Sequence, residues 1–174
     1  MKYAVRKKQH NSKMCFVCGL KNDFGLHASF YETEAKELVA LISPSEQHQG
    51  YPGRMHGGIA AAILDETMGR AICNEKDKTI WSVTLELTTK FRKPIPLDGE
   101  LKVVGRVVRE GGRFYESSGE IILPDGGIAV SATGKFMKID FDSVTSARLN
   151  DLDWFMVKNP DDPAEIEIPR EEAG

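Results

Sequence analysis

The chain has 174 residues, 41% of them hydrophobic and 28% charged, with a net charge of −3 at pH 7. This length is enough for one domain with a hydrophobic core, and the slightly acidic charge does not suggest a nucleic-acid partner. No apolar run approaches the ~20 residues of a membrane span, and the N-terminal residues lack the apolar core of a signal peptide. Three cysteines define no disulfide framework. We therefore expect a cytoplasmic protein with neither a nucleic-acid nor a membrane partner.

The N-terminal region is polar up to residue 14 and is expected to be a loose arm or a short helix. The sequence Cys15-Phe16-Val17-Cys18 follows, and such a pair is either half of a zinc site or a redox pair. A complete zinc site needs two more ligands, and only His10 and His27 are near. We therefore expect no metal, and we interpret the cysteines as small apolar residues that pack in a first turn.

Two strands are predicted next, at residues 26–33 and 37–43, and a loop follows over residues 44–55. This loop leads directly into the following element, so its polar side chains can reach a site there. His48 and Gln49 are the candidates to orient a carbonyl group or a water molecule.

The central feature is a helix predicted from the pair Gly57-Gly58 to about residue 74. One wide arc of this helix is apolar and comprises Ile59, Ile63, Leu64, Met68 and Ala71. The opposite narrow stripe holds Asp65 among the small residues Gly58, Ala62 and Gly69. One carboxylate thus lies in a row of small residues that would let a ligand or another backbone approach closely.

Both ends of this stripe indicate acyl-transfer chemistry. The first amides of a helix lack internal partners and suit a developing oxyanion, and glycines leave them uncovered. Asp65, on a mostly buried helix, would be costly without a partner or a task. Each feature alone has an ordinary structural interpretation, but together they favour a functional site. His56 precedes the helix, and its expected role is to hold the loop by hydrogen bonds rather than to act as a base.

Geometry adds a constraint, because Gly57 and Asp65 lie eight residues apart, or about 12 Å along a helix axis. One carbonyl cannot contact both groups in the same chain. A two-fold dimer with antiparallel neighbouring helices would bring them together. We therefore expect composite sites that use Gly57 of one chain and Asp65 of the other.

Four β-rich segments follow, at residues 80–92, 100–109, 113–123 and 127–139. The turns between the last three contain Glu110-Gly111-Gly112 and Pro124-Asp125-Gly126. These strands and the one long helix predict an α+β fold in a single domain over residues 1–139, with a sheet curled around the helix. Residues 140–174 are expected to form a C-terminal extension with a short helix ending near Trp154-Phe155 and an acidic, flexible tail beyond residue 160.

These features resemble the hotdog-fold acyl-CoA thioesterases of the phenylacetic-acid-degradation type, over roughly residues 14–139. The similar segments are Cys15 to Gly19 with Gly25-Leu26, Gln49 to Gly53, His56-Gly57-Gly58 with Asp65, Met68 to Ala71, Phe91 to Leu97, and the strand from Gly126 to Phe136. The resemblance implies an antiparallel sheet around one helix, dimers that often pair into tetramers, and hydrolysis of an acyl-CoA thioester. It also implies that Asp65 is the nucleophile or general base, that the Gly57 amide polarises the carbonyl, and that Thr84 helps to hold the water. Gly50 stands where some relatives carry an amide side chain, with Gln49 next to it.

A coenzyme A substrate would need cations for its phosphates, and the candidates are Arg54, Lys90, Arg92 and Lys93. Gly58 is a further candidate for binding the coenzyme A part of the substrate. Coenzyme A would be part of the substrate, so no separate cofactor is expected. Glu66 is a rival acid, but it can pair with Arg70 at i+4. Two alternatives remain: an enoyl-CoA hydratase or dehydratase that uses His48 or His56 with the acid, and a protein that binds acyl-CoA without turnover.

Overall fold

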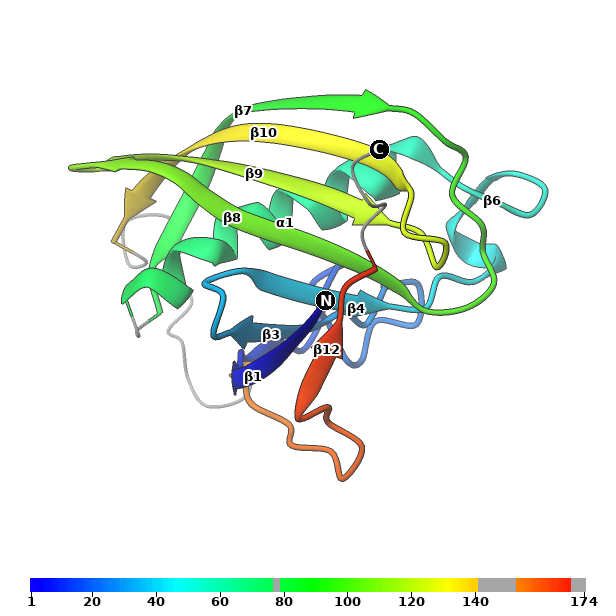
Figure 1. Cartoon of the computed structure of the whole chain (residues 1–174), viewed down its shortest axis with the longest axis horizontal. Coiled ribbons are helices and arrows are strands. Elements are labelled where there is room, and N and C mark those ends of the chain that lie inside the picture. The colour runs from blue at the N-terminus through cyan, green and yellow to red at the C-terminus, as the bar shows by residue number, and fades with distance from the viewer. Residues whose placement is uncertain (77–78, 141–152, 170–174) are drawn as a thin grey trace.

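The long helix α1 (Gly57–Lys76) lies against one face of a curved sheet of eight strands, as Figure 1 shows. The computed structural model describes residues 1–76, 79–140 and 153–169, with backbone only for 74–76. The strand order in the sheet is β12-β1-β3-β4-β8-β9-β10-β7, and every neighbouring pair is antiparallel. This confirms the α+β hotdog architecture expected from the sequence.

The strands of the main sheet agree with the predicted segments to within a few residues between residues 26 and 139. Their bounds are β1 (Lys2–Lys8), β3 (Ser29–Thr33), β4 (Leu38–Ile42), β7 (Trp81–Phe91), β8 (Leu101–Gly111), β9 (Phe114–Ile122), β10 (Ile128–Ile139) and β12 (Glu165–Glu167). Two small pairs lie outside this sheet: β2 (Asn11–Ser12) pairs with β11 (Trp154–Phe155), and β5 (Gln49–Tyr51) pairs with β6 (Arg54–Met55). A short 3-10 helix, η1 (Glu46–His48), precedes β5.

Residues alternate between the two faces of the strands, and one face packs on the predicted apolar arc of α1. The resulting core contains Phe30, Leu38, Ile63, Leu64, Met68, Leu101, Ile121 and Phe136, none of which is more than 1% exposed. Gly105 of β8 brings the sheet close to the helix, because a β-carbon there would lie 2.8 Å from the backbone oxygen of Thr67. The sheet and the helix backbone are therefore in direct contact at this point, and α1 is held firmly in place.

The N-terminal segment is a strand and not the expected loose arm or short helix. β1 pairs with β3 on one side and with β12 on the other. Lys8 at its end is 9% exposed and forms an ion pair with Asp162 at 2.6 Å. A partner far along the chain thus provides the stabilisation that the polar sequence of this segment does not suggest.

The C-terminal segment also differs from the expected flexible tail. Ile166 and Ile168 are buried in a second, smaller cluster with Tyr31, Val39, Val104 and Ile122, on the face of the sheet that points away from α1. Their alternation with Glu165 and Glu167 has the period of a strand with one buried face. Most of the helix expected within residues 142–155 falls outside the described residues, and its end, Trp154–Phe155, is strand β11.

Within the described ranges, no helix combines the length and the apolar character needed to cross a membrane.

Candidate functional site

The carboxylate of Asp65 lies half-buried at the middle of α1, facing strand β7. Oγ1 of Thr84 donates a hydrogen bond of 2.7 Å to Oδ1 of Asp65. Burial raises the pKa of Asp65 above its ordinary value, the nearby charge of Glu66 raises it further, and the hydrogen bond from Thr84 opposes both effects. Such a carboxylate is more basic than a solvated one, which suits a general base or a nucleophile.

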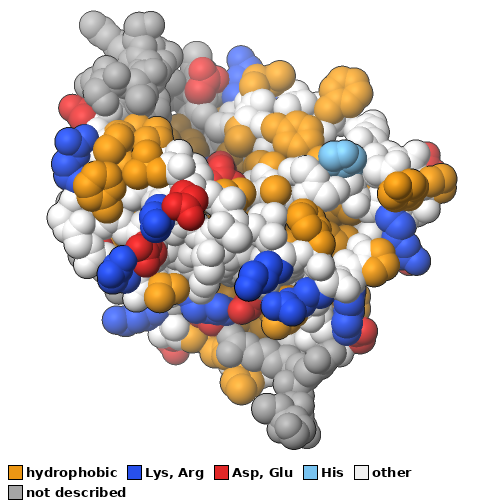
Figure 2. Space-filling model, turned by 90° about the horizontal axis from the view of Figure 1, so that it is seen from above, with side chains coloured by type: hydrophobic (Ala, Val, Ile, Leu, Met, Phe, Trp, Pro, Cys, Tyr) orange, Lys and Arg blue, Asp and Glu red, His pale blue; other side chains and the backbone are white. Residues whose placement is uncertain are grey.

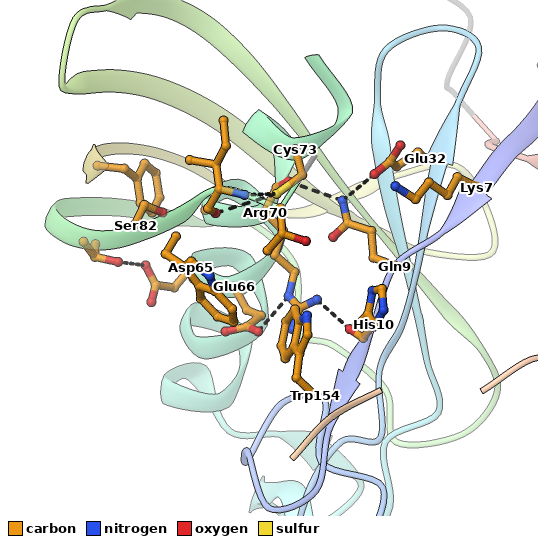
Figure 3. A pocket seen from close by; sticks show the side chains of 16 residues that line it. Lys7, Gln9, His10, Glu32, Asp65, Glu66, Arg70, Cys73, Ser82 and Trp154 are labelled. Atoms are coloured by element: carbon orange, nitrogen blue, oxygen red, sulfur yellow. Dashed lines mark hydrogen bonds and ion pairs between the residues drawn. The ribbon is translucent and has the colours of Figure 1, made fainter. Parts of the chain in front are cut away.

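Asp65 opens into a pocket of about 210 Å³ that runs along one side of α1 (Figure 3). Gly69 and Cys73 continue the helix wall at intervals of four residues, so the small-residue stripe does line a cavity over this part of the helix. Phe136 and Trp81 from the sheet form part of the opposite wall. The lining is thus mixed, because apolar side chains lie beside the carboxylates of Asp65, Glu66 and Glu32 and the cations of Lys7 and Arg70.

A buried arginine, Arg70, also lines this pocket. Arg70 pairs with Glu66 at 2.8 Å, and its Nη1 donates to the carbonyl oxygen of His10 at 2.8 Å. Its guanidinium lies over the rings of Phe30 and Trp154, 4.4 and 4.7 Å from their centroids. The expected ion pair of Glu66 is therefore confirmed, and Arg70 joins the helix to the N-terminal and C-terminal segments.

The start of α1 is organised by His56. Its Nδ1 accepts a hydrogen bond of 2.9 Å from the N–H of Gly58, and its carbonyl oxygen accepts from the N–H groups of Ile59 and Ala60. His56 is thus the N-terminal cap of the helix, which fits its expected structural role. The N–H of Gly58 is already paired, whereas that of Gly57 makes no hydrogen bond within the described part of the chain.

The ring of Phe91 covers the α-carbon of Gly57, and a β-carbon there would lie 3.3 Å from Cε1 of Phe91. This contact places the end of β7 beside the start of α1. A glycine at position 57 therefore leaves an open backbone donor next to an exposed aromatic ring.

The loop before the helix contributes less to the Asp65 pocket than its sequence suggests. His48 is buried, accepts a hydrogen bond on Nδ1 from the N–H of Ser45, and contacts the carbonyl oxygen of Phe24 through Nε2. It holds the loop together and does not face Asp65. Gln49 is exposed on β5 and is absent from the lining of the Asp65 pocket.

The four candidate phosphate ligands are exposed near the start of α1. Lys90 is on β7, and Arg92 and Lys93 follow that strand. Arg54 of β6 lies across from Pro96 in a backbone bridge, which brings the loop after β7 to the same end of the molecule. Figure 2 looks onto the side of the molecule that carries β7 and shows Lys and Arg side chains among hydrophobic ones. This placement suits the anionic end of a nucleotide-like ligand near Gly57.

Comparison with known proteins finds similarity to thioesterases. Residues 52–130 match the family model of the thioesterase superfamily. The observed hotdog fold is consistent with this match. The matched range includes Gly57, Asp65 and Thr84, and excludes β1, the Cys15–Cys18 loop and the C-terminal segment.

Relatives of known name also match outside this range. The acyl-coenzyme A thioesterase THEM4 of Rattus norvegicus is 29% identical over 139 residues, which cover 79% of this chain and 59% of that protein. The chain thus spans somewhat more than half the length of that relative. A thioesterase superfamily protein of known crystal structure superposes with a TM-score of 0.65 at 27% identity, over 72% of this chain and 63% of that one. The E. coli PaaI protein from the phenylacetic acid degradation operon shares the fold, with a TM-score of 0.59 at 17% identity over 66% of this chain and 81% of its own.

Proposed function

We propose that the protein hydrolyses an acyl-CoA thioester to the free acid and coenzyme A. The observation that carries this proposal is the half-buried, hydrogen-bonded Asp65 in the lining of a pocket. The N–H of Gly57, at the start of the same helix, makes no hydrogen bond to the residues that the structure describes. The similarity to an acyl-coenzyme A thioesterase over most of the chain supports the same activity.

In the proposed reaction the ionised carboxylate of Asp65 acts in one of two ways. As a nucleophile it attacks the thioester carbon and expels the coenzyme A sulfur, and water then hydrolyses the resulting anhydride. As a general base it takes a proton from the water that attacks the same carbon. In both cases a backbone N–H stabilises the negative charge that develops on the carbonyl oxygen. Thr84 holds the carboxylate in place by its hydrogen bond.

The oxyanion donor is proposed to be the N–H of Gly57 from a second copy of the chain. Gly57 and Asp65 of one chain are about 12 Å apart along the helix, too far to act on one carbonyl. Strand β7, which carries Thr84, is an edge strand of eleven residues with Leu85 and Phe91 exposed. An exposed edge of this length favours pairing with another chain, and a two-fold dimer would form two equal sites. Dimers of such dimers are compatible with this arrangement.

The test is thiol release from a panel of acyl-CoA substrates by the wild type and by Asp65→Asn. We expect a loss of about 10²–10⁴-fold in turnover, because Asn can neither attack nor accept a proton. Asp161→Asn, at an exposed acid outside the Asp65 pocket, is the matched control and should retain full turnover. Unchanged turnover in Asp65→Asn would refute the assigned role.

The alternatives give different results in the same experiment. A hydratase would add water to an enoyl-CoA without releasing thiol, but neither His48 nor His56 contacts Asp65 among the described residues. A binding protein would hold acyl-CoA tightly and release no thiol from any substrate. Hydration of an enoyl-CoA, or tight binding without thiol release, would contradict the proposed thioester hydrolysis.

A further inference from the structure

A pair of cysteines lies beside the catalytic helix but outside the thioesterase-superfamily match. The Sγ atoms of Cys15 and Cys18 and a carboxylate oxygen of Glu66 all lie within 4.8 Å of one another. Glu66 is the residue after Asp65, so this cluster touches the helix at the level of the proposed active site. Cys18 lies in the hydrophobic core and Cys15 packs against it, as expected, but apolar packing does not explain these polar contacts.

The loop holds the two sulfurs on one tight turn. The N–H of Gly19 donates to the carbonyl oxygen of Cys15 at 2.8 Å, and a β-carbon at Gly19 would lie 2.3 Å from that oxygen. The side chain of Asn11 also donates to the carbonyl oxygen of Cys18 at 2.8 Å. Residues three apart on such a turn present their side chains side by side, as a disulfide requires.

The two sulfurs have different surroundings. Sγ of Cys15 accepts hydrogen bonds from the N–H groups of Val17 and Cys18, at 3.3 and 3.5 Å. A hydrogen bond from the Cys18 thiol lowers the pKa of Cys15 to about 6, and raises the pKa of Cys18 itself. Cys15 is half-buried, whereas Cys18 is 1% exposed. An accessible thiolate beside a buried thiol has the arrangement of an attacking and a resolving cysteine.

Arg70 favours a dithiol over a metal site in the same place. Its Nη2 lies 3.2 Å from Sγ of Cys18, and its Nε lies 2.8 Å from the carboxylate of Glu66. A guanidinium is permanently charged, so a metal ion bound to these two groups would have to displace it or lie against it. The same cation stabilises negative charge on the sulfurs.

We propose that Cys15 and Cys18 form a redox-active dithiol that hydroperoxides convert into an intramolecular disulfide. The Cys15 thiolate attacks the terminal peroxide oxygen, the O–O bond breaks, and the sulfur becomes a sulfenic acid while the other oxygen leaves as hydroxide (from hydrogen peroxide) or alkoxide (from an organic hydroperoxide) and takes up a proton. The Cys18 thiol, giving up its proton, attacks this sulfur and displaces the second oxygen as water. Two thiols are oxidised, one peroxide is reduced, and a thiol reductant reverses the change.

Oxidation would be sensed by α1 through Arg70. In the disulfide, the negative charge of the Cys15 thiolate is lost, so the attraction between the sulfur pair and the guanidinium weakens. Arg70 also contacts Trp154, whose ring lies 4.8 Å from that of Trp81, and the chain has only these two tryptophans. We expect tryptophan fluorescence to change together with thiol loss.

The test is titration of the reduced full-length chain with hydrogen peroxide, followed by peptide mass analysis. Trypsin cleaves after Lys13 and Lys21, so both cysteines fall in one peptide. We expect this peptide to lose the mass of two hydrogen atoms in the wild type, and to regain it with dithiothreitol. Cys18→Ser should instead accumulate a sulfenic acid at Cys15 that dimedone traps, whereas Cys15→Ser should not be labelled.

Cys73→Ala is the matched control, because Cys73 is a buried thiol whose pKa is raised by burial. It should leave the oxidation of the other pair unchanged. Oxidation that depends on Cys73, or that adds oxygen to the Cys15 peptide without forming the disulfide, would overturn the proposal. So would one equivalent of zinc in the wild type that is lost in Cys15→Ser. None of these results depends on thioesterase activity.

Discussion

Oγ1 of Thr84 lies 2.7 Å from Oδ1 of Asp65 and ties the edge strand β7 to the middle of helix α1. This hydrogen bond stabilises the ionised carboxylate and fixes its direction. It acts against burial, which raises the pKa of Asp65. The edge strand therefore influences how much of Asp65 is ionised at a given pH.

Replacing Thr84 should shift the acidic limb of the pH–rate profile. Activity requires the carboxylate, so the rate falls as the pH decreases through the raised pKa of Asp65. Thr84→Val removes the donor, and we expect the limb to move to higher pH and kcat to fall by about tenfold. Thr84→Ser keeps the hydroxyl and should restore the wild-type profile. An unshifted limb in Thr84→Val would show that the hydrogen bond does not act on the ionisation that limits the rate.

The raised pKa of Asp65 also predicts a gain in stability when the acid is removed. The folded chain retains the Asp65 proton to higher pH than the unfolded chain, so this residue lowers the free energy of unfolding as pH rises through the interval between the two pKa values. Asp65→Asn cannot ionise. Its melting temperature, relative to wild type, should therefore increase as the pH rises above about 4, the ordinary pKa of an aspartate in an unfolded chain. A constant difference over that range would argue against a raised pKa.

His56 should be required for stability more than for chemistry. His56→Ala removes the acceptor for the N–H of Gly58 and should lower the free energy of unfolding by about 1 kcal/mol. His56→Asn supplies another capping side chain and should recover most of that loss. If His56 only caps the helix, His56→Asn should also keep turnover within a few-fold of wild type. Chemical denaturation and thiol release, measured on the same samples, separate the two roles.

The C-terminal strand should stabilise the whole domain. Ile168 is fully buried in the cluster on the outer face of the sheet, and its N–H donates to the carbonyl oxygen of Met1 at 2.8 Å. Ile168→Ala should lower the free energy of unfolding by about 2–5 kcal/mol, since it leaves a cavity there. Glu167→Ala, at the exposed neighbouring position, is the control and should have little effect. Equal, small effects of both variants would mean that β12 contributes little.

The helix and the strands between residues 26 and 139 were predictable because they carry hydrophobic periods and several of the turns between them contain glycine or proline. The turns at Gly112 and Gly126 have positive φ angles of 52° and 87°, as their sequences predict. β1 was not predictable, because its lysines suggest solvent and its stability depends on β12, which follows more than 150 residues later. The Glu-Ile alternation of β12 was a signal, but it is only two periods long.

Part of the site was predictable because the regular spacing of a helix shows which residues share a face. Asp65 and Gly57 could be singled out on one helix, where spacing determines direction. The contact of Arg70 with Cys18 joins residues 52 positions apart and depends on how the N-terminal loop folds back onto α1. Gln49 and His48 were placed near the site by their position before the helix, but loop residues have no period that reveals which way they point. The structure shows His48 pointing into the loop itself.

The central claim, that one thioester is shared between Asp65 of one chain and Gly57 of another, can be tested by mixing two inactive variants. Gly57→Pro removes the N–H at the first position of α1, where proline is tolerated, and Gly57→Ala controls for crowding against Phe91. When Gly57→Pro is co-expressed with Asp65→Asn, mixed dimers form in which one of the two sites has both wild-type groups.

Thiol release by this co-expressed mixture is the decisive measurement. We predict that each variant alone is inactive and that a random mixture recovers about a quarter of the wild-type activity, because half of the dimers are mixed and each has one intact site. A mixture as inactive as its components, with mixed dimers demonstrated by differential tags, would contradict the shared site.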